Sequence, residues 1–373
     1  MLGVNYIGYF NEPCGLTEAT ISNVNALEKS GIDVNVVSYL FNHKRDSYNN
    51  RAIEDSKKHE INIFHINIGT IKKFIKDLGK SQFKNKYNIA FWVWEFMEIP
   101  KEILPYMSLF DEIWTASDFC VKIFSQKALC PVICFPHPIE IPNSNLNRKE
   151  LDLPEDKFIF LTIFDSHSAI LRKNPFAVVQ SFKDTFDKDN NDVLLLVKCI
   201  NLDDFPEEKN KFHNLIKDNT NIKILNERIS RTELTGLIQN CDSLVSLHRS
   251  EGFGLTIAEA MYFKKPVIAT GYSGNMEFMN INNSFPVKYT LSPLKSSHGM
   301  IKKGFIGADA SVQDASIKMK EIFKQNNKDV ALNAQQTIMN DLSYLKIGNL
   351  MKERLLYAKQ KKKKTIVNKL FRL

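Results

Sequence analysis

The chain has 373 residues, of which 43% are hydrophobic and 25% charged, so it is long enough for two domains with ordinary globular cores. No apolar run reaches the ~18 residues that a membrane-spanning helix requires, and we expect no secretory signal peptide at the N-terminus. The six cysteines are scattered and lack the spacing of a zinc site, which predicts reduced thiols in a cytoplasmic protein.

The net charge of +8 is concentrated at the C-terminus, because the residues from Lys352 onward include nine Lys or Arg and a single Glu. The rest of the chain is therefore neutral in sum. Four lysines at 361–364 precede a segment with several apolar residues, a pattern that predicts a helix lying on an anionic membrane surface. The alternative is a solvated tail. No platform of aromatic and basic residues accompanies the run, so nucleic acid is not an expected partner.

Residues 5–10 predict a first strand, residues 16–30 an amphipathic helix closed by Gly31, and residues 34–40 a second strand. This order predicts a parallel sheet covered by helices. A further strand at residues 61–66 contains His65, and Asn67 follows it directly. Ligands of open α/β sheets gather at such strand ends, although a lone His in a strand is more often a structural residue.

Residues 87–96 predict another strand, which contains two tryptophans. We expect Trp92 to pack in the core. Trp94 and Glu95 are expected to emerge at the strand end, where an aromatic face and a carboxylate suit a sugar ring. Residues 143–156 are polar and aperiodic, which indicates a linker between two domains.

Residues 158–164 open a second sheet, and Arg172 and Lys173 then precede Asn174 and Pro175, which are typical of a helix start. A flexible cation at that place suits a diphosphate, and a solvent-exposed basic pair is the alternative. A strand at residues 193–197 is expected to end at Lys198. The only D-x-D sequence, at residues 187–189, lies in a polar loop, which argues against the metal-dependent transferase class.

Residues 243–277 combine a strand at 243–247, a glycine loop at 252–254, a helix from Thr256, a strand at 266–270 and a second glycine loop at 271–274. Free backbone N–H groups at such a helix start suit a phosphate. Glu251 and Glu259 flank the first loop, where they suit the hydroxyls of a sugar or a ribose. The alternatives are a solvated acid at Glu251 and a capping-box partner of Thr256 at Glu259.

The sequence E-G-F-G-L-x-x-x-E-A-M, followed by P-V-I-A-T and a G-x-x-G-N loop, resembles the donor site of family-4 glycosyltransferases. These are retaining, nucleotide-sugar-dependent enzymes of the GT-B fold. The resemblance implies that Glu251 contacts the transferred sugar and that Glu259 binds the nucleotide ribose. It also implies a diphosphate held at the glycine loop, which gives five more donor-binding positions: Gly252, Phe253, Gly254, Leu255 and Thr256.

The R-K-N-P sequence at residues 172–175 resembles the second donor motif of that family, whose Lys neutralises the leaving diphosphate. The resemblance therefore implies catalytic roles for Lys173 and Arg172 beside Glu251. The loop at Gly15 resembles the first glycine loop of the family. Strand ends in this fold supply further nucleotide contacts, so Gly15, Lys198 and Arg228 complete the expected donor-binding set.

Four residues are expected on the sugar and acceptor side of the site. His65 matches the first His of a family His-x-His pattern, whereas Asn67 stands in place of the second. The W-x-W-E sequence that contains Trp94 and Glu95 resembles bacterial members that work on surface polysaccharides.

The resemblance implies an α/β protein of the GT-B fold, with two Rossmann-like domains facing across a cleft and a C-terminal helix that crosses back to the N-terminal domain. The expected parts are residues 1–143 on the acceptor side, residues 144–345 for nucleotide-sugar binding, and residues 346–373 for the crossing helix and basic tail.

The expected reaction moves a sugar from a UDP- or GDP-linked donor to a hydroxyl of a glycan or lipid-linked glycan, in bacterial surface polysaccharide synthesis. No metal or other cofactor is expected. The expected location is cytoplasmic, at the inner face of the cytoplasmic membrane, with an anionic membrane surface as a partner of the basic tail. The alternatives are a GT-B-fold epimerase or phosphorylase, and a non-catalytic membrane-associated scaffold.

Overall fold

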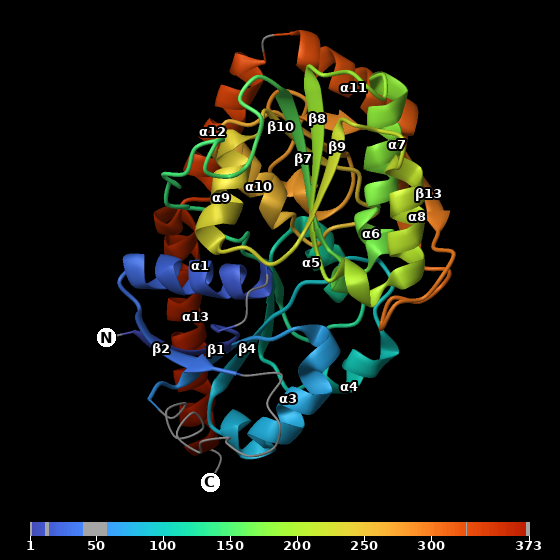
Figure 1. The fold of residues 1–373 in the computed structure, drawn as a ribbon. Helices are drawn as coiled ribbons and strands as arrows, with labels where there is room; N and C mark the ends of the chain where they lie inside the picture. The colour runs from blue at the N-terminus through green and yellow to red at the C-terminus, as the bar shows by residue number, and fades with distance from the viewer. Residues whose placement is uncertain (1, 12–14, 40–57, 326, 371–373) are drawn as a thin grey trace. The chain divides into compact units, whose positions relative to one another are not determined.

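The computed structural model describes residues 2–11, 15–39, 58–325 and 327–370, and it describes their side chains except at residue 80 and residues 362–370. By its internal contacts the chain divides into two units, one made of residues 1–140 and 340–373 and the other of residues 141–339. The sequence predicts these boundaries three and six residues later, after residues 143 and 345. Figure 1 follows the chain through both units by colour.

The first unit contains a six-stranded parallel sheet in the order β2-β1-β3-β4-β5-β6. Its strands are β1 (Gly3–Gly8), β2 (Asp33–Ser38), β3 (Ile61–His65), β4 (Tyr87–Phe91), β5 (Glu112–Thr115) and β6 (Val132–Cys134). The strand predicted at residues 87–96 is therefore shorter than expected. It ends at Phe91, which pairs with Trp114, the third residue of the four-residue strand β5.

The helices of the first unit begin with α1 (Gly15–Lys29), which ends near the predicted stop, Gly31, at a φ of 83°. The others are α3 (Ile71–Leu78), α4 (Leu104–Met107) and α5 (Asp118–Phe124), with the short turns η1 (Ile68–Thr70), η2 (Lys80–Phe83) and η3 (Lys101–Ile103). The last helix of the chain, α13 (Tyr344–Leu370), also belongs to this unit.

Helix α13 packs closely against α1, which confirms the predicted return of the last helix to the N-terminal domain. A Cβ atom on Gly348 would lie 2.0 Å from the carbonyl oxygen of Ala26, so only glycine permits this approach. The Arg354 guanidinium lies 2.7 Å from the carboxylate of Glu112, which is fully buried at the start of β5. The helix is thereby bound to both α1 and the sheet.

The second unit contains another six-stranded parallel sheet, in the order β12-β11-β10-β7-β8-β9. Its strands are β7 (Phe158–Asp165), β8 (Val193–Ile200), β9 (Ile222–Asn226), β10 (Ser243–Ser246), β11 (Val267–Thr270) and β12 (Phe285–Val287). An antiparallel hairpin, β13 (Tyr289–Pro293) with β14 (Ile306–Ala310), lies outside this sheet. This hairpin was not predicted from the sequence.

Helices cover the second sheet and enclose an apolar core that includes Phe160, Phe182, Val245 and Met319. They are α6 (Ile170–Lys173), α7 (Pro175–Thr185), α8 (Pro206–Ile216), α9 (Arg231–Asn240), α10 (Leu255–Tyr262), α11 (Val312–Lys324) and α12 (Lys328–Asp341). The short turns are η4 (Ser166–Ser168), η5 (Leu202–Asp204) and η6 (Gly274–Glu277). Among the described residues, no helix is both long enough and apolar enough to cross a membrane.

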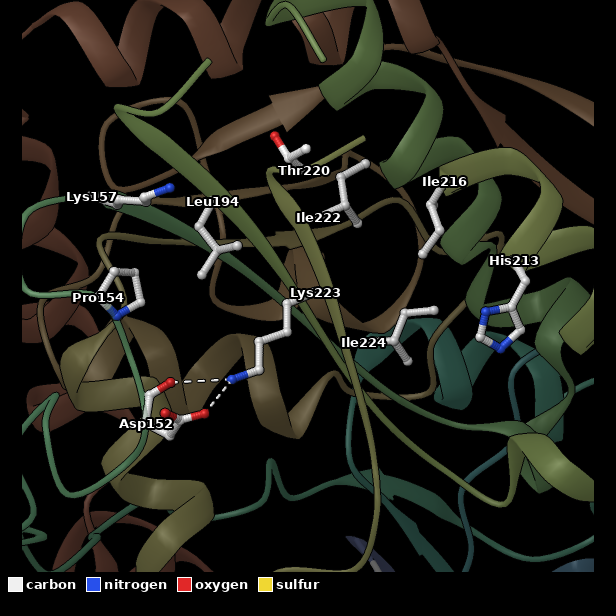
Figure 2. Close-up of a pocket in the computed structure, with 10 residues that line it drawn as sticks. All are labelled: Asp152, Pro154, Lys157, Leu194, His213, Ile216, Thr220, Ile222, Lys223 and Ile224. Carbon is white, nitrogen blue, oxygen red and sulfur yellow. Dashed lines mark hydrogen bonds and ion pairs between the residues drawn. The ribbon is translucent and has the colours of Figure 1, made fainter. Parts of the chain in front are cut away.

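A pocket of about 580 Å³ lies beside β9, the edge strand of the second sheet (Figure 2). Its apolar wall includes Leu194, Ile222 and Ile224, and Lys223 forms an exposed ion pair with Asp152 at 2.6 Å on its rim. The pocket reaches toward the amino ends of β8 and β9. The glycine loops follow the carboxyl ends of β10 and β11, so they lie at the opposite ends of the parallel strands from this pocket.

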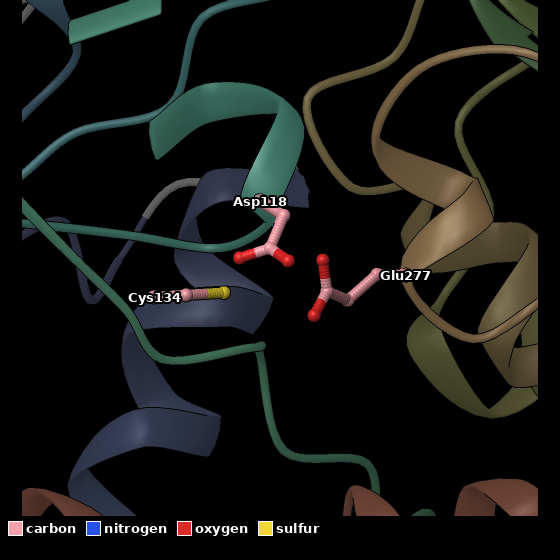
Figure 3. Close-up of side chains that lie close together, drawn as sticks. All are labelled: Asp118, Cys134 and Glu277. Carbon is pink, nitrogen blue, oxygen red and sulfur yellow. The ribbon is translucent and has the colours of Figure 1, made fainter. Parts of the chain in front are cut away.

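The five cysteines in the described part of the chain are free thiols, as predicted. Cys134 ends β6, close to Asp118 in the first turn of α5 (Figure 3). Burial raises the pKa of the Cys199 thiol to about 11 and that of the Cys241 thiol to about 12. Cys14 lies outside the described residues.

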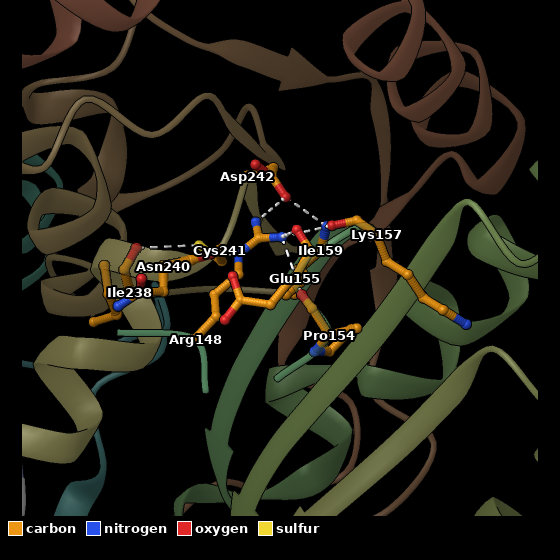
Figure 4. Close-up of polar contacts among 9 residues, drawn as sticks. All are labelled: Arg148, Pro154, Glu155, Lys157, Ile159, Ile238, Asn240, Cys241 and Asp242. Carbon is orange, nitrogen blue, oxygen red and sulfur yellow. Dashed lines mark hydrogen bonds and ion pairs between the residues drawn. The ribbon is translucent and has the colours of Figure 1, made fainter. Parts of the chain in front are cut away.

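The segment predicted as a linker is fixed to the second unit by Arg148 (Figure 4). The Arg148 guanidinium donates hydrogen bonds to the carbonyl oxygens of Asn240 at 3.1 Å and Lys157 at 2.8 Å. It also forms an ion pair with Asp242 at 2.7 Å. Because the Asp242 carboxylate accepts a further hydrogen bond from the Ile159 N–H, this network joins the linker to the first strand of the sheet.

Candidate functional site

The first glycine loop leads from β10 into α10, as the sequence predicts, but the helix begins one residue early. Its first residue is Leu255, and Gly254 precedes it in the left-handed conformation, with a φ of 96°. The predicted capping box between Thr256 and Glu259 is therefore wrong. A glycine supplies the backbone turn at this helix start, and the Glu259 carboxylate binds Arg231 instead.

The two glycine loops of residues 252–254 and 271–274 are in direct contact. The Gly274 N–H donates to the carbonyl oxygen of Glu251 at 2.8 Å, and the Glu251 N–H donates to the Ser273 hydroxyl at 2.8 Å. A Cβ atom on Gly274 would lie 2.1 Å from the carbonyl oxygen of Gly252. Only a glycine at position 274 allows the second loop to support the first.

Two cations from the R-K-N-P sequence converge on Glu251. Lys173 Nζ lies 2.5 Å from one carboxylate oxygen, and Arg172 Nη1 lies 3.1 Å from the other. Arg172 is almost fully buried and also donates to the carbonyl oxygens of Ser168 and Ser250. The Lys173 side chain retains 21% exposure. The structure thus joins both predicted donor motifs within the second unit.

The charge of Glu251 depends on these cations. Burial alone would raise the pKa of this carboxyl group, but Lys173 and Arg172 outweigh that effect and lower the pKa to about 2. Beneath the loop, burial lowers the pKa of His248 to about 4. Near neutral pH the cluster therefore combines a carboxylate, two cations and a neutral imidazole.

The backbone between these motifs is also held together. Asn174 precedes the first residue of α7, Pro175, as predicted, but its side chain does not cap that helix. Its amide instead donates to the carbonyl oxygen of Leu247 at 2.9 Å. The Arg249 N–H donates to the carbonyl oxygen of Arg172 at 2.7 Å. These bonds fix the position of Lys173 relative to Glu251.

Glu259, the second acid of the motif, is buried in α10 and forms a two-point ion pair with Arg231. Arg231 Nη2 lies 2.7 Å from Oε1 and Nη1 lies 3.2 Å from Oε2. Arg231 is the first residue of α9, which begins with a capping box between Ser230 and Glu233. Arg231 was not predicted as a site residue, because nothing in the local sequence pattern indicates a partner 28 residues away.

Lys198 lies inside β8, because that strand continues to Ile200 instead of ending at residue 197. Its ammonium group is buried and donates to the carbonyl oxygens of Cys199 and Glu227, and burial lowers its pKa. Arg228 follows β9 and donates to the Asn201 side chain at 3.0 Å. The donor-binding roles of both residues stay predictions.

His65, in the first unit, is fully buried at the end of β3. Its Nδ1 lies 2.9 Å from the Tyr6 hydroxyl, and its ring stacks on His137 with 5.7 Å between centroids. Burial, with a smaller contribution from His137, holds the pKa of His65 well below its usual value. Asn67 caps the turn η1, since its side chain accepts a hydrogen bond from the Gly69 N–H at 2.7 Å. These are structural contacts, and the predicted roles of His65 and Asn67 on the sugar and acceptor side stay predictions.

Trp94 does not offer the exposed aromatic face that the sequence predicts. It is buried, and its indole N–H donates to the carbonyl oxygen of Glu98 at 2.9 Å. The chain turns directly after β4, so the tryptophan packs against its own loop. The neighbouring Glu95 is half-buried, and Gly15 is the exposed first residue of α1. The predicted binding roles of Glu95 and Gly15 stay predictions.

A sequence comparison identifies the family. Residues 143–337, more than half of the chain, match the family model of glycosyl transferases group 1. The chain belongs to the group 1 glycosyltransferases. None of the curated proteins has a significantly similar sequence. The match covers the second unit, which contains the Lys173, Glu251 and Glu259 positions.

Several solved structures have a similar fold. Anabaena Alr3699/HepE in complex with UDP and glucose has a TM-score of 0.69 at 14% identity, over 96% of this chain and 100% of that chain. A glycosyltransferase from Rickettsia africae has a TM-score of 0.67 at 16% identity, over 96% and 98%. Sucrose-phosphate synthase from Thermosynechococcus elongatus has a TM-score of 0.67 at 12% identity, over 96% and 100%.

This group 1 glycosyltransferase therefore has the GT-B fold, with two Rossmann-like domains, and the predicted fold class is confirmed. In the second domain the described residues place the glycine loops, two cations and two buried carboxylates in one region. The D-x-D sequence at residues 187–189 lies in the exposed turn between α7 and β8.

Proposed function

We propose that the protein is a retaining glycosyltransferase of family 4. It moves a sugar from a nucleoside-diphosphate sugar to a hydroxyl of a glycan or lipid-linked glycan during bacterial surface polysaccharide synthesis. The observation that carries the proposal is the convergence of Lys173 and Arg172 on Glu251, directly beside the paired glycine loops. The UDP and UDP-glucose complexes of Alr3699/HepE support a UDP-linked donor, with a GDP-linked donor as the second candidate.

In the proposed site, the diphosphate lies at the start of α10, where backbone N–H groups and the helix dipole favour an anion. Lys173 is the more exposed of the two cations, so its ammonium group contacts the diphosphate. Arg172 is buried, and its ion pair with Glu251 fixes the position of that carboxylate. Glu251 then accepts hydrogen bonds from the hydroxyls of the transferred sugar and so orients it. Glu259 accepts hydrogen bonds from the ribose.

The proposed reaction breaks the bond between the anomeric carbon and the leaving phosphate oxygen. The acceptor hydroxyl attacks from the face that the diphosphate is leaving, so the configuration is retained. The hydroxyl proton passes to the leaving phosphate oxygen. Lys173 and the loop amides stabilise the negative charge that develops there, which is the main contribution of the protein to catalysis. With these donors at the diphosphate, we propose that transfer needs no metal and continues in excess EDTA.

Thermal unfolding with a panel of UDP, GDP, ADP, CMP and their sugars tests the donor site. A nucleotide present at 100 times its dissociation constant adds roughly 2.7 kcal/mol to the free energy of unfolding. We expect one nucleoside diphosphate to stand out, with UDP first. No stabilisation by any of them would favour the non-catalytic scaffold. Turnover of a stabilising nucleotide-sugar without any acceptor glycan would favour the epimerase or phosphorylase.

We further propose that the basic tail places the enzyme on an anionic membrane at the cytoplasmic face. Helix α13 exposes Leu345, Leu350, Leu356 and Tyr357 before it reaches the lysines at 361–364. Exposed apolar side chains followed by a basic run are typical of helices that lie on anionic lipid. Acceptors carried on lipid would then be presented close to the enzyme.

Deletion of residues 361–373 tests the membrane proposal. The truncated protein should lose binding to vesicles that contain phosphatidylserine, while its transfer to a water-soluble acceptor stays unchanged. Vesicles of phosphatidylcholine alone are the control, and neither protein should bind them strongly. Continued binding of the truncated protein to the anionic vesicles would refute a role for the tail.

A further inference from the structure

Ser273, in the second glycine loop, has a backbone conformation that is unusual for a residue with a side chain. Its φ is 73° and its ψ is −148°, close to a region that only glycine adopts readily. The residue is also buried, with 8% of its surface exposed. Such a strained conformation persists only where the surrounding structure imposes it, and it is found most often at functional sites. The neighbours of Ser273 therefore hold it in place.

The backbone that follows Ser273 is fixed by two hydrogen bonds. The Met276 N–H donates to the carbonyl oxygen of Ser273 at 3.1 Å, and the Gly274 N–H donates to the carbonyl oxygen of Glu251 at 2.8 Å. Gly274 also lies so close to Gly252 that no side chain fits between them. The second glycine loop therefore cannot relax around Ser273 without moving the first.

The Ser273 hydroxyl connects the second glycine loop to Glu251. It donates a hydrogen bond to the carbonyl oxygen of Tyr272 at 2.5 Å and accepts one from the Glu251 N–H at 2.8 Å. The bond to Glu251 is buried, so loss of its acceptor would be unfavourable. Glycine would adopt this backbone conformation without strain, but it has no hydroxyl. Serine therefore strains the loop and supplies an acceptor for the Glu251 N–H.

Glu251 is consequently held at three points. Its N–H donates to Ser273 Oγ, its carbonyl oxygen accepts from Gly274, and its carboxylate pairs with two cations, Lys173 and Arg172. The first two contacts fix the backbone from which the side chain extends. A small shift of this backbone would move the carboxylate relative to a bound sugar, and hydrogen bonds weaken steeply when their geometry is poor.

We propose that Ser273 is a positioning residue that sets the Glu251 carboxylate against the transferred sugar. It acts through the Glu251 N–H and contacts no reacting atom. The affinity of the donor site for the sugar part of the nucleotide-sugar then depends on the Ser273 hydroxyl. This inference rests on the proposed function, in which Glu251 accepts hydrogen bonds from the hydroxyls of that sugar.

Isothermal titration calorimetry with UDP and UDP-glucose tests the proposal. The ratio of the two affinities reports the sugar contacts, because the nucleotide contacts are common to both ligands. Ser273→Ala should lower the affinity for UDP-glucose relative to UDP by about tenfold, the effect of roughly one hydrogen bond. Its affinity for UDP should stay within about twofold of wild type. An unchanged ratio, or an equal fall in both affinities, would overturn the proposal. If thermal unfolding selects another base or sugar, that nucleotide and its sugar replace this pair.

Ser273→Gly separates the hydroxyl from the backbone conformation. Both variants lack the hydroxyl, but only glycine is unstrained at this φ. Ser273→Gly should therefore have the higher Tm of the two, by about 2 °C or more. Its affinity ratio should fall as it does in Ser273→Ala. A wild-type ratio in Ser273→Gly would overturn the role of the hydroxyl, and this variant also carries the test if Ser273→Ala does not fold.

Lys264→Gly is the matched control, because Lys264 also has a positive φ, of 57°, and is exposed just after the end of α10. This change relieves backbone strain outside the glycine loops. It should raise the Tm and leave the affinity ratio unchanged. A ratio that falls in Lys264→Gly as it does in Ser273→Gly would show that the ratio does not report the hydroxyl, and would overturn the proposal.

Glu251→Ala separates this inference from the proposed function, with Glu251→Gln in its place if the alanine variant does not fold. A lowered ratio in both Glu251→Ala and Ser273→Ala supports both. A lowered ratio in Glu251→Ala alone overturns only the role of Ser273. A wild-type ratio in folded Glu251→Ala overturns the assignment of Glu251 to the sugar, and the role of Ser273 with it.

Discussion

Lys173 Nζ and Glu251 Oε1 lie 2.5 Å apart, although 78 residues separate them in the chain. The lysine ends the short helix α6, and the glutamate opens the first glycine loop. Two motifs that are far apart in the sequence therefore form one charged cluster within the second domain.

Lys173→Ala should lower the rate of sugar transfer by about 100-fold or more, because it removes a charged donor from the leaving diphosphate. Lys173→Arg should recover part of the rate. Lys211→Ala, which removes a lysine with 65% of its side chain exposed, should leave transfer unchanged. Steady-state rates with the donor chosen by thermal stabilisation measure the effect. Turnover of Lys173→Ala at the wild-type rate would remove this residue from the mechanism.

Glu251 should contribute stability that depends on pH. The pKa of its carboxyl group falls from a usual 4.5 to about 2 in the folded protein. The folded state therefore binds this proton less readily than the unfolded chain. The resulting stabilisation, about 3 kcal/mol, is fully present above pH 4.5 and is lost as the pH falls toward 2.

Urea unfolding of the wild-type protein and of Glu251→Gln measures this contribution. At pH 7 the variant should be less stable by about 3 kcal/mol or more, because it leaves two cations without their counter-ion. The difference between the two proteins should shrink as the pH is lowered from about 4.5 toward 2. A difference that is constant over this range would contradict the low pKa of Glu251.

Gly274→Ala should disturb the proposed donor site more than the fold of the second domain. The new Cβ atom would lie 2.1 Å from the carbonyl oxygen of Gly252, so the first glycine loop has to move. We expect loss of nucleotide stabilisation in thermal unfolding. Gly299→Ala is the matched control, since its Cβ atom meets no neighbour within 4 Å and only its φ of 56° is unfavourable. It should cost about 1 kcal/mol of stability and leave nucleotide binding intact.

Arg354→Ala should destabilise the first domain by about 3–5 kcal/mol, because it leaves the fully buried carboxylate of Glu112 without its cation. Lys29→Ala removes an exposed partner of Glu140 and should cost less than about 1 kcal/mol. Urea unfolding followed by tryptophan fluorescence measures both, since all three tryptophans belong to the first domain. Equal stability of the two variants would contradict the importance of the buried pair.

Much of the fold follows from local sequence. Buried strands such as β3 and β7 are short apolar runs, and helix starts such as Ser230 carry complete capping signals. The hairpin of β13 and β14 escaped prediction because most residues of β13 are exposed, so no alternation of apolar and polar residues marks it. The start of α10 was misplaced because a glycine in the left-handed conformation took the place of the side-chain cap.

In the candidate site, too, some features could be predicted from the local sequence and others could not. Glu251 and Glu259 could be found because they belong to one continuous motif. The pairing of Arg231 with Glu259 depends on the packing of two helices, and no local pattern encodes it. For Trp94 the sequence predicted an exposed ring that the structure does not have. Its position after a strand suggested an exposed ring, but the turn that follows β4 buries it.

The division of the first domain into residues 1–140 and 340–373 has a consequence for synthesis on the ribosome. The second domain is continuous, so its whole sequence is available before α13 is translated. Until then the face of α1 that contains Ala26 lacks the helix that carries Gly348. The first domain is therefore completed last, although its synthesis begins first, and a nascent chain that stops near residue 339 would contain a complete second domain and an incomplete first domain.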